Sequence, residues 1–467
     1  MAPARLVVSF YGFSERKIHV SNSFRQIRMS TAFASTCALV GGGLIYARVV
    51  ADTVGPGATR LLLLAPALCV NVAAPLLVLD PEAEPLWTAI AVANFAWWTN
   101  FKLIALAAGR GQLTGPALSA PTFLALAALP VKFADERDAQ KTRPRGDESP
   151  ARTQIHLKRK RHSHPHTTRD AGVGFACKLA CLSACVCVAL PALDANSSTS
   201  KPLTLCRNAT YAVALYAFLG ALFDLGAALA SAAFGAPLAR HFDLPFLATS
   251  FGDFWGARWN LVAGASLRDT VYAPITEGRF FSNEKPSSAT RLSDSRGAEQ
   301  ERRRKSREKK SGAERKSADA PTPPTPTTSR RVVGVFACFA VSGVMHEFVL
   351  WALEGRSSRL GTSRAIGWEW FAFFFAQAPL VSLEAAYAAR RRARREKTPE
   401  DARRKKKPPT LATVFFVRAA KNGAFLAAQL ALANALFFPP VARNSLDARI
   451  VADVRKTLGL GFVPTFL

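Results

Sequence analysis

The sequence predicts an all-α fold, a polytopic transmembrane helical bundle of about nine spans joined by basic loops. Of its 467 residues, 49% are hydrophobic, yet the formal net charge is +28. The two kinds of residue are segregated, because long apolar stretches alternate with short and strongly basic ones. A soluble globule intersperses such residues, whereas a membrane protein with charged loops separates them.

Nine apolar segments have a length suited to crossing a bilayer, whose core requires about 20 mostly apolar residues in each helix. The fourth of them is the shortest. The predicted spans are 31–50, 60–79, 85–108, 117–133, 173–193, 209–235, 332–353, 366–388 and 411–438.

The distribution of positive charge predicts the orientation of these spans, because Lys and Arg concentrate on the cytosolic side of a membrane. With nine spans, the basic N-terminus falls on one side together with the basic loops 135–170, 236–331 and 390–407. Two N-glycosylation sequons, at Asn196 and Asn208, fall on the lumenal side and support the count. The segments predicted to be lumenal are 51–59, 109–116, 194–208, 354–365 and the C-terminal tail.

The basic stretches divide the chain into parts. Two of them, 135–171 and 281–330, are dominated by Lys, Arg, Ser, Pro and Glu, so we expect disordered cytosolic loops. The first 28 residues suit a targeting extension, but we favour a cytosolic tail or a start at Met29. The remaining parts are the N-terminal tail or extension (1–30), the first transmembrane helices (31–134), transmembrane helices with an amphipathic segment (172–280), helices with a candidate catalytic histidine (331–389), a basic loop (390–410) and the last transmembrane helix with its tail (411–467).

Several other functions are disfavoured. The basic residues lie between membrane-length segments and form no base-reading module, so no nucleic-acid partner is expected. Seven of the eight cysteines lie in apolar stretches, which argues against a disulfide framework. The face formed by Cys177, Cys181 and Cys185 suits helix packing better than a metal site. Four histidines in one basic loop suit a solvated segment near anionic headgroups better than a metal site: His156, His162, His164 and His166.

One of the seven histidines, His346, lies inside an apolar span and is followed directly by Glu347. Ionisable groups are costly inside a membrane, so they are candidates for function. With an unperturbed pKa of about 6.5, an imidazole is largely neutral at cytosolic pH and suits a general base. Ser342 and Gly343 lie one turn earlier on the same face, where they would leave room for a substrate. The alternative is a histidine that only hydrogen-bonds a neighbouring helix.

The segment 241–275 contains a second candidate site. Plotted as one helix, residues 250–262 have a broad apolar face and a narrow face of small or polar residues that includes Asp253 and Asn260. Such a helix suits the membrane interface, where Trp is enriched, or a place inside the bundle with Asn260 toward a cavity. Arg258 would then project among aromatic residues and reach a phosphate or stack on a ring. A plain interfacial anchor without catalysis is the alternative.

Four further polar residues lie in predicted spans: Asn94, Asn100, Lys102 and Asp224. A pair between Lys102 and Asp224 would reduce the penalty that each incurs alone. This pairing is our hypothesis, and a purely structural role for these residues is the alternative to a substrate contact.

Both candidate segments resemble one family. SFGDFWGARWNLVAGASLRDTVYAPI is similar to the signature of plant-type wax synthases, a branch of the membrane-bound O-acyltransferase superfamily, and FAVSGVMHEFVLWAL resembles their Ser-Gly-x-x-His-Glu hallmark. GPGATRLLLLAPAL, ANFAWWTNFKLIALAAGRGQL and FLALAALPVKF follow in the expected order, so the likeness covers most of residues 31–388. Ala257 stands where the family has the first Arg of an Arg-Arg pair; if that Arg contacts coenzyme A in relatives, this chain binds it differently.

The resemblance implies an enzyme of the endoplasmic reticulum membrane with the superfamily's fold, transferring a fatty acyl group from acyl-CoA to a long-chain fatty alcohol. It implies His346 as the catalytic base and Asn260 as its partner. Acyl-CoA is a co-substrate, and neither another cofactor nor a metal is expected. The expected substrate contacts come from Asp253, Trp255, Arg258, Trp259, Ser342 and Glu347.

Two alternatives stay open. Relatives of this type also esterify sterols or diacylglycerol, and nothing in the sequence defines the acceptor pocket. A lipid transporter or lipid-binding membrane protein without catalysis would be favoured by broken spans at matching places in two halves. No convincing internal repeat is seen, and the single intramembrane His-Glu pair suits catalysis better.

Overall fold

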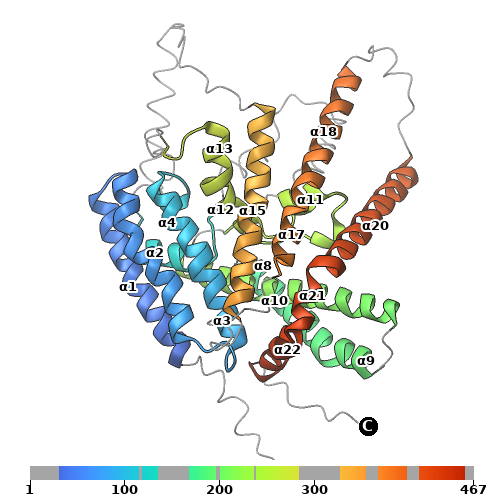
Figure 1. Ribbon diagram of the computed structural model, residues 1–467, viewed down its shortest axis with the longest axis horizontal. Coiled ribbons are helices and arrows are strands. Elements are labelled where there is room, and N and C mark those ends of the chain that lie inside the picture. The colour runs from blue at the N-terminus through green and yellow to red at the C-terminus, as the bar shows by residue number, and fades with distance from the viewer. Residues whose placement is uncertain are drawn as a thin grey trace, which may run out of the picture.

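The computed structural model describes residues 31–114, 118–134, 168–195, 200–235, 238–282, 327–353, 367–396 and 410–457. Within these ranges the chain forms helices and turns, and its β-structure is limited to one bridge between Phe133 and Leu238 (Figure 1). The all-α prediction is confirmed. The two loops predicted to be disordered and the basic N-terminus lie almost entirely outside the described residues.

Short π-helical segments interrupt several helices, and short 3₁₀ segments lie in two connections between helices; both kinds are labelled η. In chain order the elements are α1 (Thr31–Thr53), α2 (Ala58–Val78), α3 (Pro85–Ala91), η1 (Val92–Thr99), α4 (Asn100–Ala107), η2 (Gln112–Thr114), α5 (Ala120–Ala128), α8 (Thr168–Ala184), η3 (Cys185–Ala189), α9 (Leu190–Ala195), α10 (Lys201–Phe234), η4 (Pro245–Leu247), α11 (Phe251–Ala257), α12 (Leu261–Leu267), η5 (Arg268–Tyr272), α13 (Ala273–Glu277), α15 (Thr328–Ala352), α17 (Glu369–Phe375), α18 (Gln377–Glu396), α20 (Leu411–Leu436), α21 (Phe438–Arg443) and α22 (Leu446–Thr457).

Local sequence sets several of these boundaries. The side chains of Ser119, Thr327 and Thr410 each accept a hydrogen bond from the backbone N–H three residues later, at the starts of α5, α15 and α20. Pro85 begins α3, where its missing N–H costs nothing. Gly235 ends α10 in the left-handed conformation that glycine adopts without strain.

Eight helices or helix runs in the described part of the chain are long and apolar enough to cross a membrane. They confirm an integral, multi-pass membrane protein. They are Thr31–Thr53, Ala58–Val78, Pro85–Ala107, Thr168–Leu193, Lys201–Phe234, Thr328–Ala352, Glu369–Arg394 and Leu411–Arg443.

The predicted fourth span, 117–133, does not cross the membrane. It contains only α5, which has nine residues. At 1.5 Å per residue this helix is about 14 Å long, whereas the hydrocarbon core is about 30 Å thick. The described residues therefore contain eight candidate spans, one fewer than the nine predicted.

Lys102 explains how this short helix ends inside the bundle. Its Nζ donates to three backbone carbonyls at the C-terminal end of α5, those of Leu126, Leu129 and Val131. A cation is favourable at that end of a helix because of the helix dipole. The hypothesis of a pair between Lys102 and Asp224 is wrong, since Asp224 of α10 pairs with Lys178 of α8.

Three connections meet at one end of the bundle. The N–H of Gly57, between α1 and α2, donates to the carbonyl of Ala107 at the end of α4 (2.9 Å). Just beyond α4, Arg110 donates both terminal nitrogens to Glu277 at the end of α13 (2.9 and 2.7 Å). Arg110 holds the pKa of the Glu277 carboxyl below its usual range. The turn after α1, the end of α4 and the end of α13 therefore lie at the same end.

This arrangement corrects the predicted orientation. Segments 51–59 and 109–116 were predicted to lie opposite the basic loop 236–331, but the contacts above place them at its end of the bundle. Because α5 is not a span, every spanning helix before it crosses the membrane in the direction opposite to the one predicted from nine spans. The helices that flank the basic loops 135–170, 236–331 and 390–407 still have the ends leading into these loops on one side, whereas α1 begins on the opposite side.

The opposite end is closed by α22. Its Asp453 accepts the N–H of Leu86 at 3.1 Å, and its Arg449 donates to the carbonyl of Pro81 at 2.6 Å. Nearby, Asn208 is 8% exposed and donates to Asn434 of α20. A glycan would not fit there, so this sequon no longer supports the topology; Asn196 lies outside the described residues.

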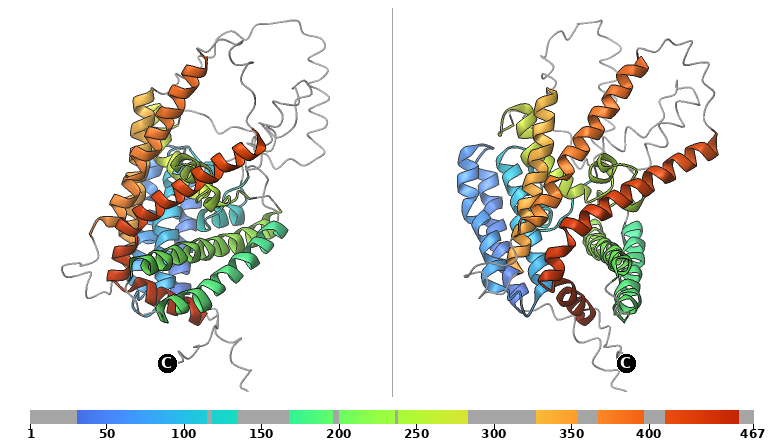
Figure 2. Two further views of the ribbon diagram at one scale, coloured as in Figure 1. Left: turned by 90° about the vertical axis from the view of Figure 1, so that its right-hand side faces the viewer. Right: turned by 45° about the vertical axis from the view of Figure 1, so that its right-hand side comes forward.

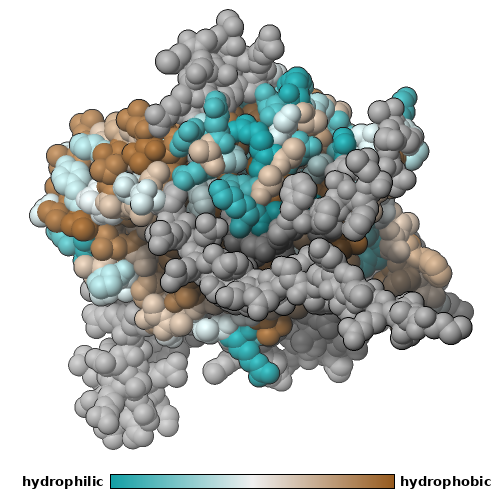
Figure 3. All heavy atoms as spheres, turned by 90° about the horizontal axis from the view of Figure 1, so that it is seen from below, coloured by the Kyte–Doolittle hydropathy of each residue, from teal (hydrophilic) through white to brown (hydrophobic). Residues whose placement is uncertain are grey.

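The outer surface suits a bilayer. The side chains of Leu39, Val49, Leu62 and Leu77 on α1 and α2 are more than half exposed. Seen from below, hydrophobic residues gather on this flank of the molecule (Figure 3). On the other flank, α18 and α20 diverge from the bundle toward the basic end (Figure 2). The exposed apolar surface of α1 and α2 is unfavourable in water, so we expect it to lie against lipid.

Candidate active site

The ring of His346 on α15 is held in one tautomer. Its Nδ1 lies 2.7 Å from the backbone carbonyl oxygen of Ser342. A carbonyl oxygen can only accept, so Nδ1 carries the proton and donates it to this bond. Nε2 therefore keeps its lone pair, which is the state that a general base requires.

Aromatic side chains surround this imidazole. Phe374 of α17 stacks on it with ring centroids 3.9 Å apart. Trp97 of η1 meets it edge-on at 5.0 Å and 77°, and Trp370 does so at 6.2 Å and 74°. The hydrogen bond of His346 stays within its own helix, so the alternative of a histidine that ties α15 to a neighbour by hydrogen bonding is not supported.

Ser342 and Gly343 do not leave the open space that we predicted. Ser342 is 8% exposed, and a Cβ added at Gly343 would lie 2.9 Å from the Cα of Phe371. The backbones of α15 and α17 therefore meet at Gly343. The small residue sets the position of α17 and of Phe374, while Ser342 acts on His346 through its carbonyl.

Glu347 faces the start of α17. It is 4% exposed, and its Oε1 accepts the N–H of Phe371 at 2.9 Å. A carboxylate at this position binds an otherwise free helix N–H and complements the positive end of the helix dipole. Its Oε2 has no hydrogen-bond partner among the described residues. A contact between Glu347 and substrate remains a prediction.

The signature segment is not the single helix that we predicted. It forms α11 and α12 with a break between them, because Asn260 adopts the left-handed conformation (φ 43°). The Asn260 side-chain oxygen accepts the N–H of Ala263 at 3.3 Å and so begins α12. Asparagine is among the residues that tolerate this conformation and favour helix starts. The two-faced pattern of residues 250–262 was therefore misread as one helix.

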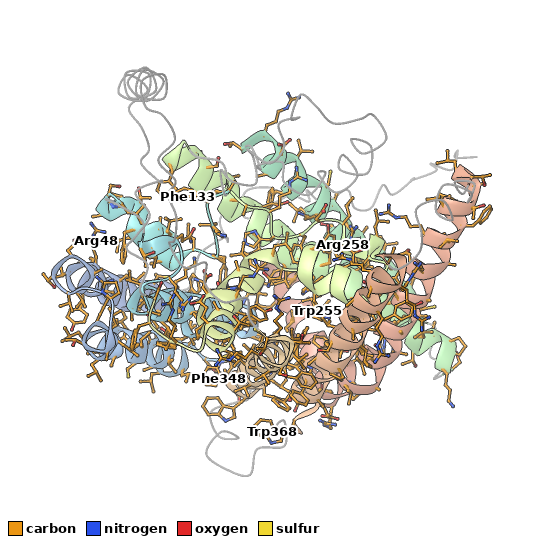
Figure 4. All side chains as sticks on the ribbon, turned by 90° about the horizontal axis from the view of Figure 1, so that it is seen from above. Arg48, Phe133, Trp255, Arg258, Phe348 and Trp368 are labelled. Atoms are coloured by element: carbon orange, nitrogen blue, oxygen red, sulfur yellow. The ribbon has the colours of Figure 1, made fainter. Side chains whose placement is uncertain are left out.

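Arg258 lies at this break and does not project freely among the aromatic rings. It is 5% exposed. Its Nε donates to Asp253 at 2.9 Å, and its Nη1 donates to the carbonyls of Asp243 (3.0 Å) and Leu244 (3.3 Å). Figure 4 shows Arg258 close to Trp255 on the same segment. Arg258 and Asp253 thus fix the loop, and their predicted contact with substrate is untested.

The two tryptophans of the signature occupy different surroundings. Trp259 packs on Phe254 (5.3 Å) and Phe242 (5.0 Å). Trp255 donates its indole N–H to Gln377 of α18 at 3.0 Å, and its ring lies 5.8 Å from that of Phe374. Phe374 thus contacts both Trp255 and His346, so one aromatic layer joins the two candidate segments.

A carboxylate of α18 also holds α11. Glu384 accepts the N–H groups of Phe251 (3.0 Å) and Gly252 (2.8 Å), the first two residues of α11. Sequence analysis missed both Glu384 and Gln377, because they read as ordinary polar residues of a long helix. Their position could have identified them, because both lie in a predicted apolar span, where polar side chains are costly and are therefore candidates for a structural or functional role.

His346 and Asn260 do not bond to each other. In the described part of the chain their side-chain hydrogen bonds run to Ser342 and Ala263. Whether both contact one substrate stays a prediction.

A pocket lies between α4 and α12, near the end where α13 stops. Its lining combines apolar groups with two lysines, a carboxylate and an amide: Phe101, Lys102, Ala105, Gly111, Gln112, Leu113, Lys132, Val262, Ala265, Ser266 and Asp269. Among the residues that the structure describes, no three His, Cys, Asp or Glu side chains come together as a metal site. The histidine-rich loop is not among them.

Curated proteins named as O-acyltransferases are similar to this chain. An acyl-CoA–sterol O-acyltransferase of Arabidopsis thaliana is 31% identical over 245 residues, which are 52% of this chain and 62% of that protein. A long-chain-alcohol O-fatty-acyltransferase of Simmondsia chinensis is 30% identical over 225 residues, 47% and 54% of the two chains. A probable long-chain-alcohol O-fatty-acyltransferase of Arabidopsis thaliana is 30% identical over 176 residues, 38% and 42%.

The chain spans about half the length of these curated relatives, and no protein-family model matches it. Two of these relatives carry the wax synthase name that the two sequence hallmarks predicted, and the third carries the name of an alternative acceptor, a sterol. The resemblance is therefore confirmed: the chain is similar to the long-chain-alcohol O-fatty-acyltransferases, or wax synthases, and to a sterol O-acyltransferase.

Proposed function

We propose that the chain is an acyl-CoA-dependent O-acyltransferase that forms wax esters from acyl-CoA and a long-chain fatty alcohol. The observation that carries the proposal is the fixed tautomer of His346. Its Nε2 keeps a lone pair in a shell of aromatic rings inside the membrane-spanning bundle. The names of the similar proteins give the class of reaction.

In the proposed reaction the hydroxyl of the fatty alcohol donates to Nε2 of His346. Its proton moves to Nε2 as the oxygen attacks the thioester carbonyl. The tetrahedral intermediate then expels the thiolate of coenzyme A, which takes the proton back. No acyl-enzyme is required, and a dry site between helices aligns the two lipid substrates.

Asn260 is proposed to orient the acyl donor. Its oxygen is used at the start of α12, so its amide nitrogen is left to donate. One correctly placed donor to a developing oxyanion contributes about 2.7–4 kcal/mol.

The basic end of the bundle is the proposed entry for acyl-CoA. Lys132, which lines the pocket at this end, and the neighbouring basic loops would attract its phosphates. With this end on the cytosolic side of the endoplasmic reticulum, the donor reaches the site from the cytosol.

A sterol is the second candidate acceptor. One observation favours it. Of the three relatives described above, the sterol O-acyltransferase matches the longest stretch of this chain, 245 residues. The chemistry at His346 is the same for either hydroxyl.

The test is expression in a host that lacks neutral-lipid synthesis, with labelled acyl-CoA and fatty alcohol, sterol or diacylglycerol supplied to its membranes. We expect wax ester from the wild type. His346→Ala should lower the rate by at least about 100-fold, in line with removal of a general base. Cys338→Ala, two turns away on the same helix, is the control and should retain the wild-type rate.

Steryl ester without wax ester would replace the acceptor and keep the reaction class. Full activity of a correctly inserted His346→Ala variant would reject the proposed base.

A further inference from the structure

Buried side-chain donors almost always have a hydrogen-bond partner, so exceptions require an explanation. In the described part of the chain, two buried donors without partners lie on adjacent, stacked rings: Nε1 of Trp97 and Nε1 of Trp98. Trp97 is 5% exposed and Trp98 is 6% exposed. Trp indole groups usually find a partner when buried.

Trp97 is the donor that contacts the candidate base. Its ring meets that of His346 edge-on, with centroids 5.0 Å apart. Its other ring neighbours, Trp98 and Phe101, offer no acceptor. It also lies in the π-helical segment η1, and such segments are frequent at functional sites.

The two groups have opposite hydrogen-bonding capacities. An indole N–H can only donate, whereas Nε2 of His346 can only accept in the tautomer that Ser342 fixes. A hydroxyl that gives up its proton needs the acceptor. A carbonyl oxygen that gains negative charge during attack needs a donor.

We propose that the indole N–H of Trp97 binds the carbonyl oxygen of the acyl thioester and stabilises the oxyanion; this rests on the proposed function. As the hydroxyl proton passes to Nε2 of His346, the new C–O bond forms and the carbonyl electron pair moves onto the oxygen held by Trp97. The carbonyl then re-forms, the C–S bond breaks, and the thiolate takes the proton from His346.

The free protein carries this N–H unsatisfied, which destabilises it until substrate binds. Removing the N–H alone should therefore change activity and stability in opposite directions. A tryptophan that only fills space would not behave in this way.

The test is Trp97→Phe, which keeps an aromatic ring and removes the N–H. We expect kcat for ester formation to fall by about 100-fold, the loss typical of one oxyanion donor. The melting temperature of Trp97→Phe should fall, because the smaller ring leaves a cavity, whereas that of the isosteric variant described next should be unchanged or higher. Replacement of Trp97 by benzothienylalanine, in which sulfur takes the place of the N–H on a ring of the same shape, should have the same effect on kcat.

Trp98→Phe is the matched control. Trp98 stacks on Trp97 at 5.7 Å, and its own N–H is equally unpartnered, but its other ring contact is to Phe223. We expect its kcat to stay within about twofold of the wild type.

Wild-type kcat in the benzothienylalanine protein would overturn the proposal, and so would an equal loss in Trp98→Phe. If Trp97→Phe folds poorly, the isosteric replacement decides. If the wild type forms no ester, so that His346→Ala also has no effect, the result would instead refute the proposed function itself.

Discussion

Buried side chains in this protein are committed to partners that their positions in the sequence do not reveal. Arg258 was predicted to reach a phosphate or a ring, but Asp253 and two backbone carbonyls occupy it. His346 was predicted correctly as an intramembrane imidazole, and only the structure assigns its proton to Nδ1. Helix periodicity gives the face of a residue, whereas the partner depends on segments far away in the chain.

Gly343 provides a prediction at this scale. A Cβ there would lie 2.9 Å from the backbone of Phe371, which cannot move as a flexible side chain can. Gly343→Ala should destabilise the protein by about 1–3 kcal/mol, as overpacking does. It should also slow ester formation, because Phe374 would shift against His346. Unfolding and activity measured in detergent test both effects.

Gly264→Ala on α12 is the control. A Cβ at Gly264 would have nothing within 4 Å, so the replacement should be neutral or stabilise by about 0.5–1 kcal/mol. Equal stabilities of the wild type and Gly343→Ala would mean that α15 and α17 do not meet as described.

At the scale of elements, two helices begin on carboxylates supplied by other helices. Glu347 of α15 binds the start of α17, and Glu384 of α18 binds the start of α11. Because α17 leads into α18, these two contacts connect the helix of His346 to the segment of Asn260. A short helix such as α11 has little stability of its own, so its position depends on such contacts.

We therefore expect Glu384→Gln to act on Asn260 from a distance. The amide oxygen can accept one N–H of α11, but the amide nitrogen faces the other. The variant should lose about 1–2 kcal/mol of stability, the cost of removing a helix cap. A 1.4 kcal/mol loss of transition-state positioning corresponds to an about tenfold lower kcat.

Glu82→Gln, an exposed carboxylate in the turn before α3, is the matched control and should change neither quantity. Glu384→Gln with wild-type kcat would show that α11 needs no cap for activity. A fall in stability without a fall in kcat would restrict the role of Glu384 to folding.

At the scale of the whole molecule, the short α5 decides the topology. With eight spans, the turn after α1 lies on the side of the basic loops, and the turn before α3 lies on the opposite side. Nine spans would reverse both assignments.

Single cysteines at Gly55 and Glu82, introduced into a cysteine-free chain, test this topology. In sealed membrane vesicles, an impermeant maleimide should label Gly55→Cys together with a reference cysteine in segment 283–326. Glu82→Cys should react only after permeabilisation. The reverse pattern would restore the nine-span topology.

The sequence by itself determined the class of fold, most of the spans, the two hallmark segments and the resemblance to wax synthases. These depend on composition, on periodicity and on short motifs, which are local properties. Only the tertiary structure decided that α5 stops short, that the signature breaks at Asn260, and that Lys102, Arg258, Glu347 and Glu384 hold backbone groups. The physical reason is that a buried polar group must find a partner, and in this bundle most partners are backbone groups that carry no mark in the sequence.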